Sequence, residues 1–285
     1  MTVASGSLQD VASRPMTIRR VVKGAKRQWL WGYTLLFAVL LYLPSVFILI
    51  FSFNSGIHIA FPLKEWTFDW YRQMAQDDAL LDAALNSLKV ASASSLCATA
   101  VGTLGAFALV RYRWPGGQAI TGLSMLPLLM PSIIMGIALL VLLRAAGLDN
   151  SLTAITCGHI VFCTPLSLSI MMSRFVTLDR SLEEAAMDLG ANEVGTFLKI
   201  TLPLSFAAIF ASIILCFTTS IDEFVIAFFL SGTDATLPLY IWGQLRFPSH
   251  LPEILALGSC MLVASLLLVF ISEALRRRGA RQLEA

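Results

Sequence analysis

The sequence predicts an all-α integral membrane protein with six transmembrane helices and both termini in the cytoplasm. Hydrophobic residues make up 57% of the 285 residues and charged residues only 13%, and the mean hydropathy is +0.77. The apolar residues gather in runs of about 20 or more, the length that a helix needs to cross roughly 30 Å of hydrocarbon. Positive charge is also divided very unevenly between the two expected sides. These observations exclude an ordinary soluble domain.

Six apolar runs are long enough to span a membrane. We place them at about 29–53, 87–110, 119–143, 151–173, 204–230 and 254–275. The first run is longer than the roughly 7 to 15 residues of a signal-peptide core and has no clear cleavage site, so we expect it to remain as an anchor. The expected organisation is a basic N-terminal tail over 1–28, a membrane domain over 29–275 and a basic C-terminal tail over 276–285.

The distribution of Lys and Arg gives the orientation. An even number of spans puts both termini on one side, and that side receives fifteen of the twenty basic residues. The fifteen are Arg14, Arg19, Arg20, Lys23, Lys26, Arg27, Arg111, Arg113, Arg174, Arg180, Lys199, Arg276, Arg277, Arg278 and Arg281, and the other five are Lys64, Arg72, Lys89, Arg144 and Arg246. Because cytoplasmic segments retain positive charge during insertion, both termini are predicted to be cytoplasmic.

Several classes of function lack the residues that they need. A net charge of +2, with the basic residues at the two ends, favours anionic lipid over nucleic acid as partner. The five cysteines lie inside apolar runs without zinc or disulfide spacings, so we interpret them as small core residues. His58, His159 and His250 are scattered, and we predict no metal site and no enzyme active site. His159 is interpreted as a hydrogen-bonded core residue rather than a proton relay.

Small residues and prolines are expected to affect how the predicted spans pack and bend. Ser94, Ala98, Gly102 and Ala106 recur every four residues in the second span, which predicts a groove where a neighbouring backbone can approach closely. Three prolines, which are Pro127, Pro131 and Pro165, remove backbone donors within the third and fourth spans and should bend them. The sequence leaves open whether such a bend lines a passage or is an irregularity of packing.

The segment 179–203, between the fourth and fifth spans, reads as two short helices on the cytoplasmic face. Ser181, followed by two glutamates, suits a helix start, and Gly190 fits a left-handed helix end. Asn192 can cap the next helix, and Pro203 opens the fifth span. The sequence therefore predicts a helix-turn-helix.

An apolar strip runs along the first of these helices. It consists of Leu182, Ala185, Ala186 and Leu189. At these spacings the four side chains share one face, and the small alanines would let another protein come close. The alternative is a helix that rests on lipid headgroups, but the acidic flank of Glu183, Glu184 and Asp188 would be repelled by an anionic leaflet. A protein partner is therefore favoured.

This segment resembles the EAA loop of binding-protein-dependent ABC importer permeases. The matching positions are Glu184, Ala185, Ala186, Gly190, Ile200, Leu202 and Pro203. The resemblance covers about 83–275 and implies a MetI-like permease fold in the bacterial inner membrane. It implies that the loop (below, the EAA loop, residues 179–203) docks in a cleft of a cytoplasmic ATPase subunit, with Leu182 and Leu189 beside the motif residues.

The resemblance also implies the remaining partners. Such importers have two permease subunits, here expected to be a heterodimer, a cytoplasmic ATPase dimer and a periplasmic substrate-binding protein. No P-loop of the form G-x-x-x-x-G-K-[ST] occurs in this sequence, so we expect no cofactor on this chain and ATP with Mg on the ATPase. The chain is thus expected to be a transport subunit and not an enzyme.

Three shorter motifs resemble the spermidine/putrescine permeases in particular. They are Phe51-Ser-Phe-Asn54, Ala84-Leu-Asn-Ser-Leu88 and Ser220-Ile-Asp-Glu-Phe224. The resemblance implies a polyamine substrate. Importers of opine-like compounds, phosphonate, sulfate or iron share much of this framework and remain alternatives.

Asp222 and Glu223 are the candidate substrate-pathway residues. They fall in the outer half of the fifth predicted span, where carboxylates usually signal a water-filled path or a partner charge. Such a site would attract a cationic solute. The alternative is that the span ends near Thr219 and both acids begin an external loop, although the apolar run 225–230 argues against it.

Three other classes of membrane protein remain as rivals. An ion-coupled secondary carrier should work without an ATPase, an intramembrane enzyme needs convergent catalytic groups, and a passive channel should conduct as its own oligomer. None of them accounts for the EAA loop.

Overall fold

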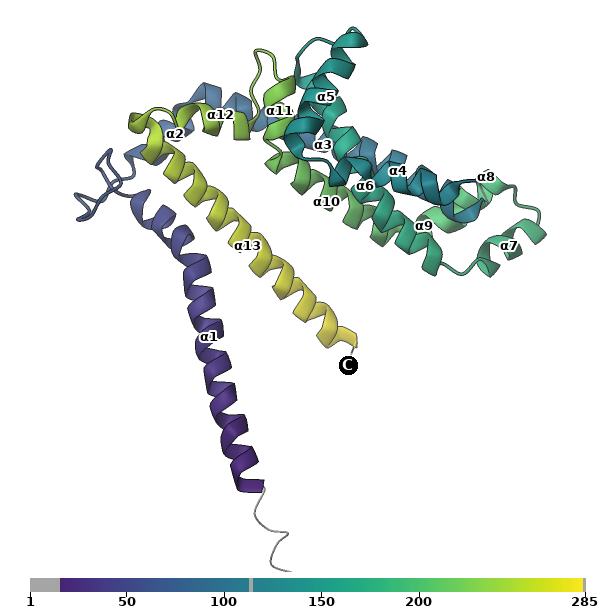
Figure 1. Ribbon diagram of the computed structural model, residues 1–285, viewed down its shortest axis with the longest axis horizontal. Helices are drawn as coiled ribbons and strands as arrows, with labels where there is room; N and C mark the ends of the chain where they lie inside the picture. Colours follow the sequence, from purple (N-terminus) through teal and green to yellow (C-terminus); the bar gives the residue numbers. More distant parts are fainter. Residues whose placement is uncertain (1–15, 113–114, 284–285) are drawn as a thin grey trace, which may run out of the picture. The chain divides into compact units, whose positions relative to one another are not determined.

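The computed structural model describes residues 16–112 and 115–283, and these residues are predominantly helical (Figure 1). Within them, the β-structure consists of one isolated antiparallel bridge between Asn54 and Trp66. The described residues divide into two compact units, with the boundaries between residues 73 and 74 and between residues 248 and 249; the two ends of the described chain form the first unit and the part between the boundaries forms the second.

The first unit contains two long helices, α1 (Met16–Phe51) and α13 (Leu251–Leu283), with the short helix α2 (Asp69–Gln76) at its boundary. The helix α1 begins inside the expected tail 1–28, whose first fifteen residues lie outside the described part. Tyr71, on α2, joins the end of α1 to α13, because its hydroxyl makes hydrogen bonds of 2.7 Å with Ser52 and 3.1 Å with Ser259.

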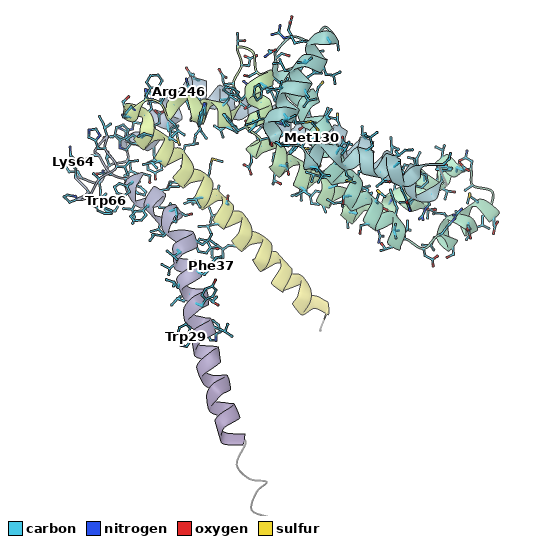
Figure 2. The ribbon with its side chains drawn as sticks, in the orientation of Figure 1. Trp29, Phe37, Lys64, Trp66, Met130 and Arg246 are labelled. Atoms are coloured by element: carbon cyan, nitrogen blue, oxygen red, sulfur yellow. The ribbon has the colours of Figure 1, made fainter. Side chains whose placement is uncertain are left out.

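From Trp29 onward, most of the large apolar side chains of α1 are exposed. In Figure 2, Trp29 and Phe37 project from this helix, and their exposed fractions are 84% and 57%. A helix that leaves most of its apolar surface outside the protein core has the character expected of a lipid-facing span.

The second unit runs from α3 to α12. Its helices are α3 (Asp78–Arg111), α4 (Gly117–Leu129), α5 (Ser132–Ala145), α6 (Leu152–Thr177), α7 (Ser181–Asp188), α8 (Glu193–Thr196), the π-helix η1 (Phe197–Thr201), α9 (Leu202–Leu204), α10 (Phe206–Asp222), α11 (Val225–Leu230) and α12 (Leu237–Gln244). Three of them, α3, α6 and α10, pack together as its core.

The small residues of α3 make this packing possible. Ser94, Ala98 and Ala106 are fully buried, and a Cβ atom added at Gly102 would lie 2.3 Å from Ser167 Oγ and 2.8 Å from the backbone nitrogen of Leu168. The predicted groove of small side chains is confirmed, and α6 occupies it.

Polar side chains join the three core helices. His159 Nδ1 lies 2.7 Å from Ser220 Oγ, which in turn lies 2.9 Å from Ser94 Oγ. The prediction that His159 is a hydrogen-bonded core residue is confirmed.

The expectation that all the cysteines are core residues holds only in part. Cys163 and Cys216 are fully buried. Cys97 and Cys260 are exposed, so for these two the prediction is wrong, because apolar runs in a membrane helix include outward-facing positions. Cys157 is half-buried.

Among the described residues, four helices are long and apolar enough to cross a membrane, and the number rises to six if each of two bent helix pairs counts as one span. The pair α4 and α5 is bent by 108° where Met130 ends one helix and Pro131 precedes the next (Met130 is labelled in Figure 2). The bend expected from Pro131 is thus present as a break, whereas Pro165 lies inside the continuous helix α6.

Candidate functional site

A side-chain hydrogen bond holds the start of the first helix of the EAA loop. The helix α7 starts at Ser181, as predicted, and the carboxylate of Asp179 accepts a hydrogen bond of 3.0 Å from the Ser181 backbone nitrogen. This hydrogen bond lowers the pKa of Asp179. A negative charge there also suits the positive end of the helix dipole.

The turn that ends α7 has the geometry expected of Gly190. Its φ of +93° is a left-handed conformation that glycine adopts without strain. The nitrogen of Gly190 donates to the Met187 carbonyl at 2.9 Å, and the nitrogen of Ala191 donates to the Ala186 carbonyl at 3.0 Å. This pair of bonds is a Schellman motif.

The second helix of the loop is also capped as expected. Asn192 Oδ1 accepts a hydrogen bond of 2.7 Å from the nitrogen of Gly195, one turn into α8. The helix-turn-helix predicted for this segment is therefore confirmed, although its second helix continues directly into the π-helix η1.

The apolar strip of α7 faces away from the rest of the second unit. Leu182 is 47% exposed and Leu189 is 91% exposed, Ala185 is exposed and Ala186 is half-buried. Val194, on the next helix, adds a further side chain at 66% exposure. Several exposed apolar side chains on one loop are typical of a protein contact.

The later motif residues lie where the loop joins the long helix. Ile200 is part of the π-helix, and Leu202 and Pro203 form the first turn of α9. Ile200 and Leu202 are half-buried and Pro203 is exposed. π-helical turns are rare and frequently occur at functional sites, so the motif ends at an unusual backbone geometry.

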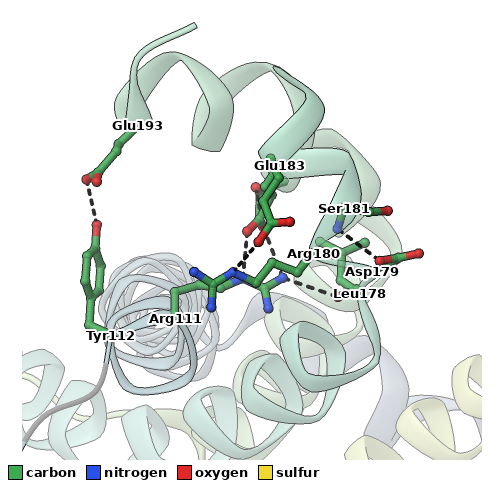
Figure 3. A network of polar contacts seen from close by, with 10 residues as sticks. Arg111, Tyr112, Leu178, Asp179, Arg180, Ser181, Glu183 and Glu193 are labelled. Atoms are coloured by element: carbon green, nitrogen blue, oxygen red, sulfur yellow. Dashed lines mark hydrogen bonds and ion pairs between the residues drawn. The ribbon is translucent and has the colours of Figure 1, made fainter. Parts of the chain in front are cut away.

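A buried ion pair anchors the loop to the end of α3, as Figure 3 shows. Arg111 Nε lies 2.8 Å from Glu183 Oε2, and the two side chains are only 11% and 8% exposed. Thr201, in the π-helix, donates a second hydrogen bond of 2.8 Å to Glu183. One carboxylate thus joins α3, α7 and η1.

Sequence reasoning missed this role of Glu183. The helical spacing placed it on a solvated acidic flank, together with Glu184. In the structure Glu184 is indeed exposed and pairs with Arg180 at 3.2 Å, but Glu183 is buried. Its partner Arg111 lies 72 residues earlier in the chain, and no local pattern shows such a contact.

Two further contacts tie down the far side of the loop. The Tyr112 hydroxyl donates a hydrogen bond of 2.9 Å to Glu193 (Figure 3), and this bond to a carboxylate raises the pKa of Tyr112. Arg174, near the end of α6, donates to the carbonyl of Leu204. The end of α3 thus holds the loop, and the end of α6 holds Leu204, the residue that directly follows it.

The two candidate pathway carboxylates lie at a helix break, which we call the 222–224 break. The helix α10 ends at Asp222, three residues beyond the end near Thr219 that the alternative predicted, and α11 begins at Val225. Asp222 is exposed and Glu223 is half-buried. Glu223 also caps α11, because its Oε1 accepts a hydrogen bond of 3.0 Å from the nitrogen of Ile226.

The short helix α11 is held tightly against its neighbours. Ile226 and Leu230 are buried. A Cβ atom at Gly136 of α5 would lie 2.6 Å from the ring of Phe229, and one at Gly158 of α6 would lie 2.5 Å from Leu230 Cδ1. The lack of a side chain at these two glycines therefore lets α11 pack closely against α5 and α6.

Within the described residues, no group of three or more His, Cys, Asp or Glu side chains is arranged to hold a metal ion. What the site offers is therefore a tethered apolar surface on the EAA loop and carboxylates at a separate helix break.

The chain shares its fold with a solved transporter. The structure described as a bacterial ABC transporter involved in the import of the acidic polysaccharide alginate superposes with a TM-score of 0.67. The match covers 90% of this chain and 96% of the other, at 19% sequence identity.

Two relatives are similar over nearly the whole chain. The putrescine transport system permease protein PotI of Escherichia coli (strain K12) is 37% identical, with 89% of this chain and 90% of PotI covered. The spermidine/putrescine transport system permease protein PotC of the same strain is 35% identical, with 91% of this chain and 96% of PotC covered. Residues 98–281 match the family described as binding-protein-dependent transport system inner membrane component, and the chain belongs to this family.

Proposed function

We propose that this chain is the permease subunit of an ATP-driven importer of polyamines such as spermidine and putrescine. Its EAA loop docks on a cytoplasmic ATPase, and its helices form half of the solute pathway. The main support for the coupling role is the exposed apolar strip, in which Leu189 is the most exposed residue. The buried ion pair of Arg111 and Glu183 holds the loop that presents this strip. The relatives PotI and PotC, by their names, support the substrate.

The proposed topology has six spans and cytoplasmic termini. Four single helices and the bent pair α4 and α5 supply five of the six apolar segments, and α10, which forms the second bent pair with the end of the EAA loop, supplies the sixth. Fifteen of the twenty Lys and Arg fall on the side of the termini. On that side lie the proposed tails, 1–28 and 276–285, and the EAA loop. The membrane is the bacterial inner membrane.

The proposed partners supply the functions that this chain lacks, which are ATP hydrolysis, delivery of the solute and the other half of the pathway. ATP and Mg bind a separate ATPase dimer, because this sequence has no P-loop. A periplasmic binding protein delivers the solute, in keeping with the description of the family. A second permease subunit completes the pathway as a heterodimer.

Asp222 and Glu223 are proposed to act on the solute. Polyamines carry several positive charges, and negative charge along a pathway offsets part of the cost of removing them from water. Asp222 is exposed at the 222–224 break and therefore remains open to a passing cation.

The test is ATP hydrolysis by the complete reconstituted complex with its binding protein. Spermidine and putrescine are compared with sulfate, phosphonate and ferric iron. Stimulation by polyamines alone supports the proposal. Stimulation by an anion would retain the importer and contradict both the polyamine substrate and the role of the two carboxylates. Uptake without any ATPase would contradict the importer itself.

A further inference from the structure

The first glutamate of the EAA loop, Glu183, has no role in the docking surface described above. It is buried and makes contacts with two other elements, Arg111 at the end of α3 and Thr201 in the π-helix. The exposed Glu184 beside it pairs with Arg180, which directly precedes α7, at 3.2 Å. Of the two adjacent carboxylates, Glu183 therefore joins separate elements, whereas Glu184 makes a local, exposed ion pair.

The contacts of Glu183 are of a kind that resists relative motion. A charged hydrogen bond to a guanidinium is stronger than a neutral one, and removal of one partner would leave the other charge buried without compensation. The additional hydrogen bond from Thr201 connects α7 to the start of the segment that leads into α10. A displacement of α7 is thus passed both to α3 and to the helix that ends at the 222–224 break.

Tyr112 provides a second point of attachment. It follows Arg111 directly and donates to Glu193 on α8, so the end of α3 holds both helices of the loop. Two attachment points fix the orientation of the loop, whereas one would allow it to pivot. At the turn between the two helices, no described atom beyond the neighbouring residues lies within 4 Å of the place where a Cβ of Gly190 would be.

We propose that Glu183, Arg111 and Tyr112 are positioning residues that make the EAA loop and α3 move as one body, so that motion of the docked ATPase reaches the spans. This inference rests on the proposed function of the chain. Loss of the tether uncouples ATP hydrolysis from uptake, while the docking surface remains intact.

The experiment measures uptake and ATP hydrolysis together in the complete reconstituted complex. Glu183→Gln removes the charge with little change of shape, and Asp149→Asn is the matched control, because Asp149 lies in an exposed pair with Arg144. We expect Glu183→Gln to retain the ATPase and to lower uptake per ATP hydrolysed about fivefold or more, and the control to leave this ratio unchanged. An unchanged ratio for Glu183→Gln in an assembled complex would overturn the proposal.

A cross-link separates positioning from a merely structural role. Tyr112→Cys and Glu193→Cys are introduced into the Glu183→Gln chain, with the exposed Cys97 and Cys260 changed to serine. Closing the new pair with a short bifunctional reagent re-creates the tether by other means. Restored uptake per ATP supports the proposal, and continued uncoupling after complete cross-linking contradicts it.

A milder variant serves if Glu183→Gln does not accumulate in the membrane. Tyr112→Phe removes one exposed hydroxyl, and we expect uptake per ATP to fall about twofold, with an unchanged ratio counting against the tether. The wild-type complex distinguishes failure of this inference from failure of the proposed function. If the proposed function were wrong, the loaded binding protein would not stimulate ATP hydrolysis by the wild-type complex.

Discussion

The EAA loop and the 222–224 break both interrupt helices of the second unit, but they arrange charge and apolar surface in opposite ways. At the loop, the ion pair of Arg111 and Glu183 is buried and Leu189 is 91% exposed. At the break, Leu230 is buried and Asp222 is exposed. The loop is held by polar contacts and presents an apolar surface, which suits a protein partner. The break is held by apolar packing and presents carboxylates, which suits a cation.

The largest effect should come from spoiling the apolar surface of the loop. Glu184→Lys together with Ala185→Glu places a bulky charge in the docking surface. We expect binding of the ATPase subunit to weaken about 100-fold or more, as at the centre of other interfaces, with little change in folding because both residues are exposed. Co-purification of the ATPase with the membrane complex measures this. Unchanged binding would remove the docking role of the strip.

The next effect tests the apolar packing that holds the break. Gly158→Val puts methyl groups where Leu230 and Ile226 lie, and we expect a loss of about 1 to 3 kcal/mol in the free energy of unfolding. Gly122→Val is the matched control, since no atoms lie near the Cβ position of Gly122. Thermal unfolding in detergent compares the two variants. Equal stability would show that α11 is not held by this contact.

The two carboxylates of the break should differ from each other. We expect Asp222→Asn to lower polyamine uptake about fivefold, the size of one exposed charge interaction, and to leave thermal stability unchanged. Glu223→Gln should lower uptake and also cost about 0.5 to 1 kcal/mol, because Glu223 caps α11. Uptake assays and unfolding curves for both variants check this. Identical effects of the two variants on stability would contradict the assignment of the cap.

The smallest effect is a pH dependence at the start of α7. The pKa of Asp179 is lowered by its bond to Ser181, so its contribution is present above the ordinary value of about 3.9 and is lost as the pH falls through the lowered pKa. Amide hydrogen exchange at Ser181 should lose protection in that acidic range. The Asp179→Asn variant should show no such step, and a step that persists in it would assign the titration to another group.

Local patterns predicted most of the EAA loop. Gly190 and Asn192 set their own turn and cap through their backbone preferences, so their roles could be read from the sequence. The burial of Glu183 could not, because it depends on Arg111, which is distant in the chain. An apolar run also does not show where its helix breaks: 119–143 contains no charged residue, and yet the backbone turns by 108° within it. The sequence predicted a bend at Pro131 but not its size.

The groove of small residues on α3 could be predicted for a similar reason. Steps of four residues place side chains on one helix face whatever the rest of the fold, so Ser94 and Gly102 could be assigned to an interface in advance. At the 222–224 break, the sequence offered a continuous span or an early end near Thr219. The structure has neither, because Glu223 ends one helix and caps the next.

Photo-cross-linking from position 189 tests the central claim most directly. A photoreactive amino acid replaces Leu189, the most exposed apolar residue of the loop, in the assembled complex in membranes. The account predicts a specific cross-link to the ATPase subunit, which is lost in the Glu184→Lys, Ala185→Glu chain. Cross-links to lipid alone, in a complex that still hydrolyses ATP, would contradict it.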